Sequence, residues 1–229
     1  MRDYYVRGLS GERLRLCYEL APPRVRRYLE AEVAFVLERV RPASVVLELG
    51  CGYGRVLKEL ARRARRVVGI DLSAASMAVA HRAAPGCGLA LMDAAALGLA
   101  DRSFDVVVCI QNGLSAFGAD AVVLLSEASR VARPGGTILC STYSPRFWSE
   151  RLRWFEIQAE NGLVGPIDYE ATGDGLIVCR DGFRATTASA EQFRSWAEAL
   201  GLAATVVEVD GSSLCCEMVT RRDGPSPSL

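Results

Sequence analysis

Three glycines and a carboxylate are the residues of this sequence whose spacing is best suited to bind a ligand. Gly50, Gly52 and Gly54 occupy alternate positions after a short apolar run, and apolar residues at helical spacing follow them. We expect a buried strand, a tight glycine turn and a helix. Such a turn admits a ligand where any Cβ would collide and brings helix N–H groups close to it. Glu48 lies inside the end of the strand.

A second carboxylate ends the next predicted strand, Arg66–Asp71. Its distance from Gly54 along the chain is close to the roughly 20 residues expected for a carboxylate that meets a ribose. Asp71 can accept hydrogen bonds from both ribose hydroxyls. The alternative role is to cap the following helix, but Ser73 already suits the N-cap position, so we favour ribose binding.

The glycine spacing differs from that of nicotinamide dehydrogenases, whose third glycine comes one residue later. Residues 48–54, Glu-Leu-Gly-Cys-Gly-Tyr-Gly, resemble the first motif of class I S-adenosylmethionine (SAM) dependent methyltransferases. The resemblance covers roughly Val45 to Ser141 and includes Asp71 and the Arg-Pro-Gly-Gly turn at 133–136. It implies an α/β fold with a Rossmann-like, seven-stranded, mostly parallel sheet covered by helices on both faces, SAM as cofactor and methyl transfer as activity. Taken alone, residues 48–54 also suit an ordinary strand–helix turn of another α/β enzyme.

The resemblance further implies which residues contact the cofactor and the methyl acceptor. Asp93 would accept a hydrogen bond from the adenine amine, and the N–H of Ala94 would donate to a ring nitrogen. Gln111 and Asn112 follow the strand at 103–110, on the sheet edge where open α/β sheets bind ligands. The predicted cofactor site comprises Glu48, Gly50, Cys51, Gly52, Asp71, Leu72, Asp93, Ala94, Ile110 and Gln111. The predicted acceptor site comprises Tyr18, Asn112, Tyr143 and Trp148.

Methyl transfer from SAM depends mainly on alignment, which can supply about 7–11 kcal/mol of the barrier. A general base is needed only if the acceptor is protonated, and the sequence points to none. Gly113 and Leu114 follow Asn112, which disfavours the Asn-Pro-Pro-Tyr type of enzyme that methylates exocyclic amines of nucleic acids. No paired carboxylates suggest a metal-dependent catechol enzyme. We therefore expect a small-molecule acceptor.

Eight cysteines motivate a second hypothesis, a thiophilic methyltransferase of the arsenite type. Its candidate thiolate ligands are Cys17, Cys179, Cys215 and Cys216. The sequence has no Cys-x-x-Cys pair and a single histidine, His81, so we expect no metal site and read the cysteines as buried free thiols. A SAM-binding protein without catalysis is a third hypothesis, which turnover of SAM would reject.

The elements around these residues form one predicted domain, 1–229, with a helical cap at 1–42, an insert at 144–187 and a disordered tail at 223–229. The cap carries two predicted helical pieces that pack over the cofactor in the family it resembles. The insert carries a helix with four aromatic residues and a hairpin at Asp181-Gly182. The aromatic group suits a lid over the substrate and a small core of the insert equally well.

Other boundaries follow from local patterns. We expect a helix from Arg55 to Ala61, a helix over 121–132 that ends in the turn at 133–136, and a fifth strand over 137–143. The basic run at 62–66 suits a helix C-terminus better than an RNA contact.

Composition limits the partners. The formal net charge is zero, so we expect no nucleic-acid partner, and no apolar run reaches the ~18 residues of a membrane span. No apolar segment of a signal peptide follows Met1, and we expect a cytoplasmic protein.

Overall fold

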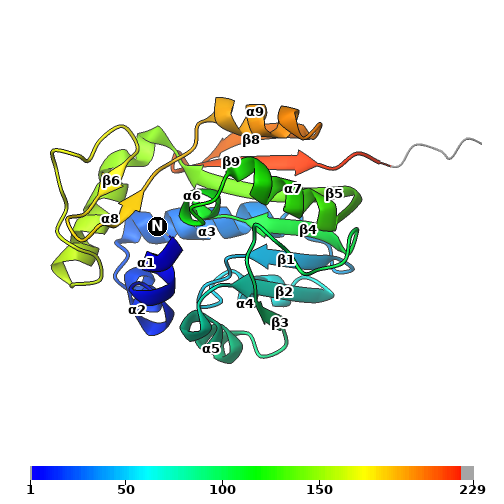
Figure 1. Cartoon of the computed structure of the whole chain (residues 1–229), viewed down its shortest axis with the longest axis horizontal. Helices are drawn as coiled ribbons and strands as arrows, with labels where there is room; N and C mark the ends of the chain where they lie inside the picture. Colours follow the sequence, from blue (N-terminus) through cyan, green and yellow to red (C-terminus); the bar gives the residue numbers. More distant parts are fainter. Residues whose placement is uncertain (1, 223–229) are drawn as a thin grey trace, which may run out of the picture.

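One seven-stranded sheet organises the part of the chain that the structure, a computed structural model, describes, residues 2–222. Its order is β3-β2-β1-β4-β5-β9-β8 (Figure 1). The strands are β1 (Val45–Leu49), β2 (Arg66–Asp71), β3 (Gly88–Leu91), β4 (Phe104–Cys109), β5 (Ala132–Tyr143), β8 (Ala203–Val209) and β9 (Ser213–Val219). Pairing is parallel from β3 to β5 and antiparallel where β9 joins β5 and β8. This confirms the predicted fold class. The predicted disordered tail lies outside the described residues.

Helices cover both faces of the sheet. They are α1 (Arg2–Arg7), α2 (Gly11–Glu19), α3 (Pro23–Leu37), α4 (Leu57–Ala61), α5 (Ala74–Ala83), α6 (Gly113–Ala116), α7 (Ala121–Val131), the 3-10 helix η1 (Pro145–Phe147), α8 (Trp148–Glu160) and α9 (Ala190–Ala199). One core cluster contains buried side chains of α3, α4 and α5, such as Val36, Leu57 and Met77. Another contains those of α7 and α9, such as Leu124 and Phe193.

The strand order creates a crevice at the carboxyl ends of β1 and β4. From β1 the chain proceeds to β2 and β3 on one side, then returns to β4 on the other side of β1. Ligands of open α/β sheets bind where the order reverses in this way. The glycine turn follows β1, and Gln111 and Asn112 follow β4, so the fold brings the two predicted segments to the same place.

The predicted number of N-terminal helices and the predicted start of the helix after the glycine turn were wrong. Three helices, α1, α2 and α3, precede β1 instead of two, because the chain turns at Gly8 and again at Ala21. α4 begins at Leu57 instead of Arg55. Gly54 has φ +89°, and its N–H donates to the Cys51 carbonyl at 2.9 Å, so the turn extends further before the helix begins.

The segment Arg133–Gly136 was predicted as a turn before the fifth strand, but it lies inside β5. α7 ends at Val131, and Ala132 already pairs with Phe104 of β4. Between that pair and the next one, Val106 with Thr137, the register shifts, so the extra residues form a bulge. Gly135 supplies the φ of +73° that the bulge requires.

The insert and the N-terminal helices share one apolar core. In Figure 1, α1, α2, α8 and β6 lie together at the left end of the molecule. The indole N–H of Trp154 on α8 donates to the Cys17 carbonyl on α2 at 2.9 Å. Phe155 and Phe183 belong to the same cluster as Leu9 and Cys17. The aromatic group of the insert therefore forms a core with the cap.

The predicted hairpin of the insert is present as β6 (Ile177–Val178) and β7 (Arg184–Ala185). Arg151 of α8, which is almost fully buried, fixes its position. Its guanidinium donates to the carbonyls of Gly175 at 2.7 Å and Ala185 at 2.8 Å and lies 4.5 Å from the centre of the Tyr143 ring. α8 thereby joins the hairpin to the end of β5.

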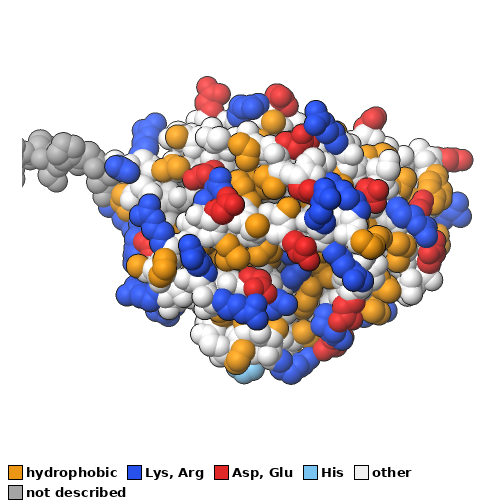
Figure 2. All heavy atoms as spheres, turned by 180° about the vertical axis from the view of Figure 1, so that it is seen from behind, with side chains coloured by type: hydrophobic (Ala, Val, Ile, Leu, Met, Phe, Trp, Pro, Cys, Tyr) orange, Lys and Arg blue, Asp and Glu red, His pale blue; other side chains and the backbone are white. Residues whose placement is uncertain are grey.

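The face drawn in Figure 2 intersperses acidic, basic and apolar side chains, without a continuous patch of one charge. Among the helices of residues 2–222, none combines the length and apolar character required to cross a bilayer.

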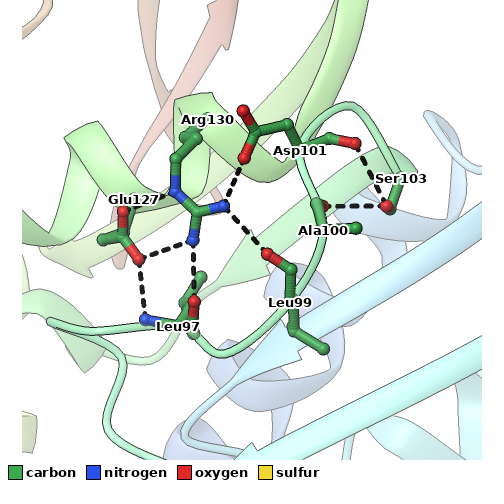
Figure 3. A network of polar contacts seen from close by, with 7 residues as sticks. All are labelled: Leu97, Leu99, Ala100, Asp101, Ser103, Glu127 and Arg130. Atoms are coloured by element: carbon green, nitrogen blue, oxygen red, sulfur yellow. Dashed lines mark hydrogen bonds and ion pairs between the residues drawn. The ribbon is translucent and has the colours of Figure 1, made fainter.

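An arginine network fastens α7 to the loop before β4 (Figure 3). The guanidinium of Arg130 donates to the carbonyls of Leu97 and Leu99, both at 2.8 Å, and to Glu127 and Asp101. Glu127 in turn accepts the Leu97 N–H at 2.7 Å. Backbone groups of Leu97 and Leu99, in the loop between β3 and β4, are thus hydrogen-bonded to side chains of α7.

We expect Arg130→Ala to lower the free energy of unfolding by about 1–2 kcal/mol, because two backbone carbonyls lose a charged donor. Arg153→Ala is the matched control. Among the described residues, Arg153 forms ion pairs only with Glu156 and Glu160 on an exposed helix face, so we expect little change. Urea denaturation of both variants measures the difference, and equal losses would contradict a role of the backbone contacts.

Candidate functional site

The glycine turn forms part of a cavity wall without adding side chains to it. Gly50 and Gly52 have φ of +68° and +53°, a region that glycine adopts without strain. A Cβ on Gly50 would lie 3.0 Å from the Phe117 ring, and one on Gly52 would lie 3.1 Å from Leu14. Both glycines line a cavity at the carboxyl ends of β1 and β4.

Asp71, at the end of β2, holds the glycine turn in place through a hydrogen bond. Its Oδ2 accepts the Gly52 N–H at 2.9 Å, and its Oδ1 accepts the Ser73 N–H at 2.8 Å. Burial raises the pKa of Asp71, while the two N–H donors oppose that rise. Ser73 is the N-cap of α5 and accepts the Ser76 N–H at 3.1 Å, so Asp71 does not serve as that cap.

Glu48 presents an unpartnered carboxyl oxygen in the wall of the cavity. The residue is 5% exposed, and its Oε2 is buried without a hydrogen-bond partner. Burial raises the pKa of Glu48 to about 8; Arg55 opposes the rise and Asp71 adds to it. An unsatisfied buried carboxyl favours a ligand that brings a cation or a hydrogen-bond donor.

Gln111 forms the polar floor of the cavity after β4. Its φ of +58° is unusual for a residue with a side chain, and Ser141 holds it there by accepting the Gln111 N–H at 2.7 Å. The side-chain carbonyl of Gln111 accepts a hydrogen bond from the Tyr18 hydroxyl, and its amide donates to Tyr143 Oη at 3.0 Å. Residues from α2, β4 and β5 are thereby linked.

Asn112 is fixed beside it by three bonds. Its N–H donates to the Ser141 carbonyl at 3.1 Å, its amide donates to the Thr186 carbonyl at 2.7 Å, and its side-chain oxygen accepts from Thr142 at 2.9 Å. Asn112 therefore connects the end of β4 to the hairpin of the insert.

The cavity brings together most of the residues predicted from sequence. Those that line it are Glu48, Gly50, Cys51, Gly52, Asp71, Leu72, Ile110 and Gln111 from the predicted cofactor site, and Tyr18, Asn112 and Tyr143 from the predicted acceptor site. Asp93, Ala94 and Trp148 are not in the lining. Asp93 Oδ1 accepts the Ala95 N–H at 3.0 Å, Ala94 is fully buried in the sheet core, and Trp148 packs in the core shared by cap and insert. Their proposed contacts with ligands stay predictions.

Two charged residues of the site were missed from sequence. Arg55 lines the cavity, and its guanidinium lies 5.3 Å from the centre of the Tyr18 ring. Glu32 of α3 is fully buried behind the floor and accepts the Ser141 hydroxyl at 2.5 Å. The signal was present: Glu32 follows Tyr28 by four residues and precedes Val36 by four, so it interrupts the apolar face of α3.

The four cysteines of the thiophilic hypothesis do not meet. Cys17 and Cys179 lie in the core shared by cap and insert, whereas Cys215 and Cys216 belong to the cores on opposite faces of the sheet. Burial raises the pKa of Cys17 and of Cys179 to about 12, which disfavours thiolates. Over residues 2–222, no group of three or more potential ligand side chains is arranged to hold a metal ion.

A family model described as a methyltransferase domain matches residues 46–136. The matched stretch begins in β1, ends in β5 and contains the glycine turn, Asp71 and Gln111. Residues 46–136 therefore carry a methyltransferase domain similar to that of the class I SAM-dependent methyltransferases. SAM is the cofactor of that family.

Individual proteins extend the comparison. A demethylmenaquinone methyltransferase of Beutenbergia cavernae is 32% identical over 170 residues, 73% of this chain and 65% of that relative. An arsenite methyltransferase of Aquipseudomonas alcaligenes is 36% identical over 140 residues, 53% of this chain and 39% of that relative. The chain thus spans less than two-thirds of the length of these curated relatives. A SAM-dependent methyltransferase of Methanosarcina mazei shares the fold with a TM-score of 0.62 at 17% identity, covering 82% of this chain and 98% of that one.

The buried carboxyls of Glu48, in the cavity wall, and Glu32, behind it, make the stability of the fold depend on pH. Burial raises the pKa of Glu48 to about 8 and that of Glu32 to about 7, above the ordinary glutamate value of 4.5. Between about pH 5 and 8 the folded chain therefore retains protons that the unfolded chain releases, and the free energy of unfolding falls as pH rises. The slope is at most about 1.4 kcal/mol per pH unit for each group.

We expect Glu48→Gln to remove part of this decline and Glu32→Gln another part, since neither amide titrates. Urea denaturation at several pH values between about 5 and 8 measures the slopes. Slopes equal to wild type in both variants would contradict the assignment of the decline to these carboxyls.

Proposed function

We propose that this chain transfers a methyl group from SAM to a small-molecule acceptor. The observation that carries the proposal is a single cavity that combines the glycine turn, the anchored carboxylate of Asp71, the unpartnered carboxyl of Glu48 and the polar floor of Gln111. When bound, SAM supplies an activated methyl group, whose C–S electron pair stays on sulfur as the acceptor forms the new bond.

Three features of the cavity suit the cofactor. Gly50 and Gly52 form its wall without side chains, and a Cβ at either position would lie in tight contact with Phe117 or Leu14. Asp71 has both oxygens fixed by backbone N–H groups, so its remaining lone pairs can accept ribose hydroxyls. The unpartnered oxygen of Glu48 suits a cationic group, which would also lower the pKa of that carboxyl.

The acceptor would lie on the other side of the cavity, against Tyr18, Gln111, Asn112 and Tyr143. Burial raises the pKa of Tyr18 well above its ordinary value and that of Tyr143 to about 12, so neither phenol ionises near neutral pH. The hydrogen bonds through Gln111 instead hold both hydroxyls in place. These residues therefore act by alignment, the contribution that methyl transfer needs most.

The two curated relatives described above are named for demethylmenaquinone and arsenite as acceptors. The dispersed positions of Cys17, Cys179, Cys215 and Cys216 disfavour the second. A panel of organic acceptors is therefore the first to test. Release of S-adenosylhomocysteine with any of them would reject a SAM-binding protein without catalysis.

We expect Asp71→Asn to weaken binding of S-adenosylhomocysteine at least tenfold, because charged hydrogen bonds to ribose contribute about 1.5–3 kcal/mol. Isothermal titration calorimetry with SAM, S-adenosylhomocysteine and NAD measures this directly. Asp120→Asn is the matched control: Asp120 also accepts a backbone N–H, that of Val122 at 2.7 Å, but it caps α7 and does not line the cavity.

Wild-type protein that binds NAD but neither of the other two compounds would overturn the cofactor assignment. Asp71→Asn protein that binds S-adenosylhomocysteine as tightly as wild type would remove Asp71 from the site.

A further inference from the structure

Arg55 places a positive charge in the wall of the cavity. It is partly buried, and its Nη1 donates to the Leu29 carbonyl of α3 at 3.3 Å. The guanidinium lies over the Tyr18 ring of α2, 5.3 Å from its centre. These contacts occupy one face of the guanidinium and one of its N–H donors. A guanidinium has five N–H donors, arranged for bidentate binding of an anion, so others remain for a ligand.

No carboxylate of the described residues forms an ion pair with Arg55. Other arginines of the chain do find one, as Arg24 does with Asp210 and Arg39 with Glu217. The acidic groups that influence Arg55 from a greater distance are Glu32 and Glu48. Burial raises the pKa of Glu32 to about 7 and that of Glu48 to about 8, so neither carries a full negative charge at pH 7. Arg55 therefore has partial charge compensation from a distance and no direct carboxylate partner among the described residues.

Arg55 is also the sole cationic residue among the described residues that line the cavity. Around it stand aromatic side chains: the ring of Tyr18 lies 5.2 Å from that of Tyr53 and 5.6 Å from that of Trp154. A single guanidinium among aromatic rings suits a ligand with an apolar body and one negative charge. A carboxylate meets this condition, whereas a phosphate dianion would call for more positive charge than the wall supplies.

The contacts of Arg55 belong to the acceptor side of the cavity. Both groups that touch the guanidinium, the Leu29 carbonyl and the Tyr18 ring, come from the N-terminal helices. Tyr18 also binds Gln111, the polar floor on which the acceptor would rest. Asp71 and the Gly52 N–H, by contrast, lie toward α5.

We propose that the methyl acceptor is a small carboxylic acid whose carboxylate binds Arg55 and whose apolar body packs against the rings of Tyr18, Tyr53 and Trp154. The inference rests on the proposed function, since it names the acceptor class of the same site. Arg55 acts here as a binding residue that selects the acceptor.

The test is calorimetric titration of the protein saturated with S-adenosylhomocysteine. The probes are benzoate, 4-hydroxybenzoate and phenylacetate, each beside its methyl ester, with phenyl phosphate as a further anion. We expect at least one acid to bind at least tenfold more tightly than its ester, and Arg55→Gln to abolish that preference. Arg15→Gln, which removes a charge from the exposed face of α2, should retain it.

Several outcomes would overturn the proposal. These are esters that bind as well as their acids in every pair, acids that fail to bind in all three, and a preference for phenyl phosphate over benzoate. Arg55→Lys keeps the charge and replaces Arg55→Gln if the latter fails to fold, with an expected weakening of acid binding because the bidentate geometry is lost.

One comparison separates the acceptor from the cofactor. Arg55→Gln should bind S-adenosylhomocysteine and 5′-methylthioadenosine, which lacks the amino-acid carboxylate, with the same relative affinity as wild type. A selective loss of S-adenosylhomocysteine binding would assign Arg55 to the cofactor carboxylate and overturn the proposal. Failure of wild-type protein to bind S-adenosylhomocysteine would instead refute the proposed function itself.

Discussion

The hydrogen bond from the Gly52 N–H to the Asp71 carboxylate, 2.9 Å long, is the interaction on which the site depends. It ties the turn after β1 to the end of β2, and it forms because the parallel register pairs Leu49 with Ile70. The same carboxylate accepts the Ser73 N–H, which begins α5. One side chain thus sets the position of the glycine turn, the end of a strand and the start of a helix, and a displacement of any of them would reshape the cavity.

Much of the fold follows from the sequence because its parallel strands are short, continuous apolar runs. β2 has the predicted bounds, and the glycine turn, Asp71 and Gln111 meet because the parallel strands end at one edge of the sheet. These features depend on local pattern and on a general rule of topology. The bulge at Arg133–Gly136 was missed because its Pro-Gly-Gly composition is that of a turn, while pairing to β4 begins before it.

The rest of the site depends on packing between distant segments, which no local pattern encodes. Glu32 reaches the floor only because α3 packs beside β5, where Ser141 meets it. Arg55 faces the cavity because α2 and α3 offer it a ring and a carbonyl. The side chain of Ala94 lies in the sheet core, and the predicted contact of its backbone N–H with the cofactor stays a prediction.

The position of α2 has a consequence for how this chain can be altered. On one side α2 is fastened to α5 by two hydrogen bonds. The Gly11 N–H donates to Ser76 Oγ at 3.0 Å, and the Arg82 guanidinium donates to the Glu12 carboxylate at 2.6 Å. On the other side it carries the Cys17 carbonyl that binds Trp154 of the insert. The insert is therefore not an independent module. Replacing the insert by that of another protein would keep the pocket closed only if the new segment brought an indole or another hydrogen-bond donor to α2. New specificities are therefore more accessible by changing side chains that line the cavity than by replacing the whole insert.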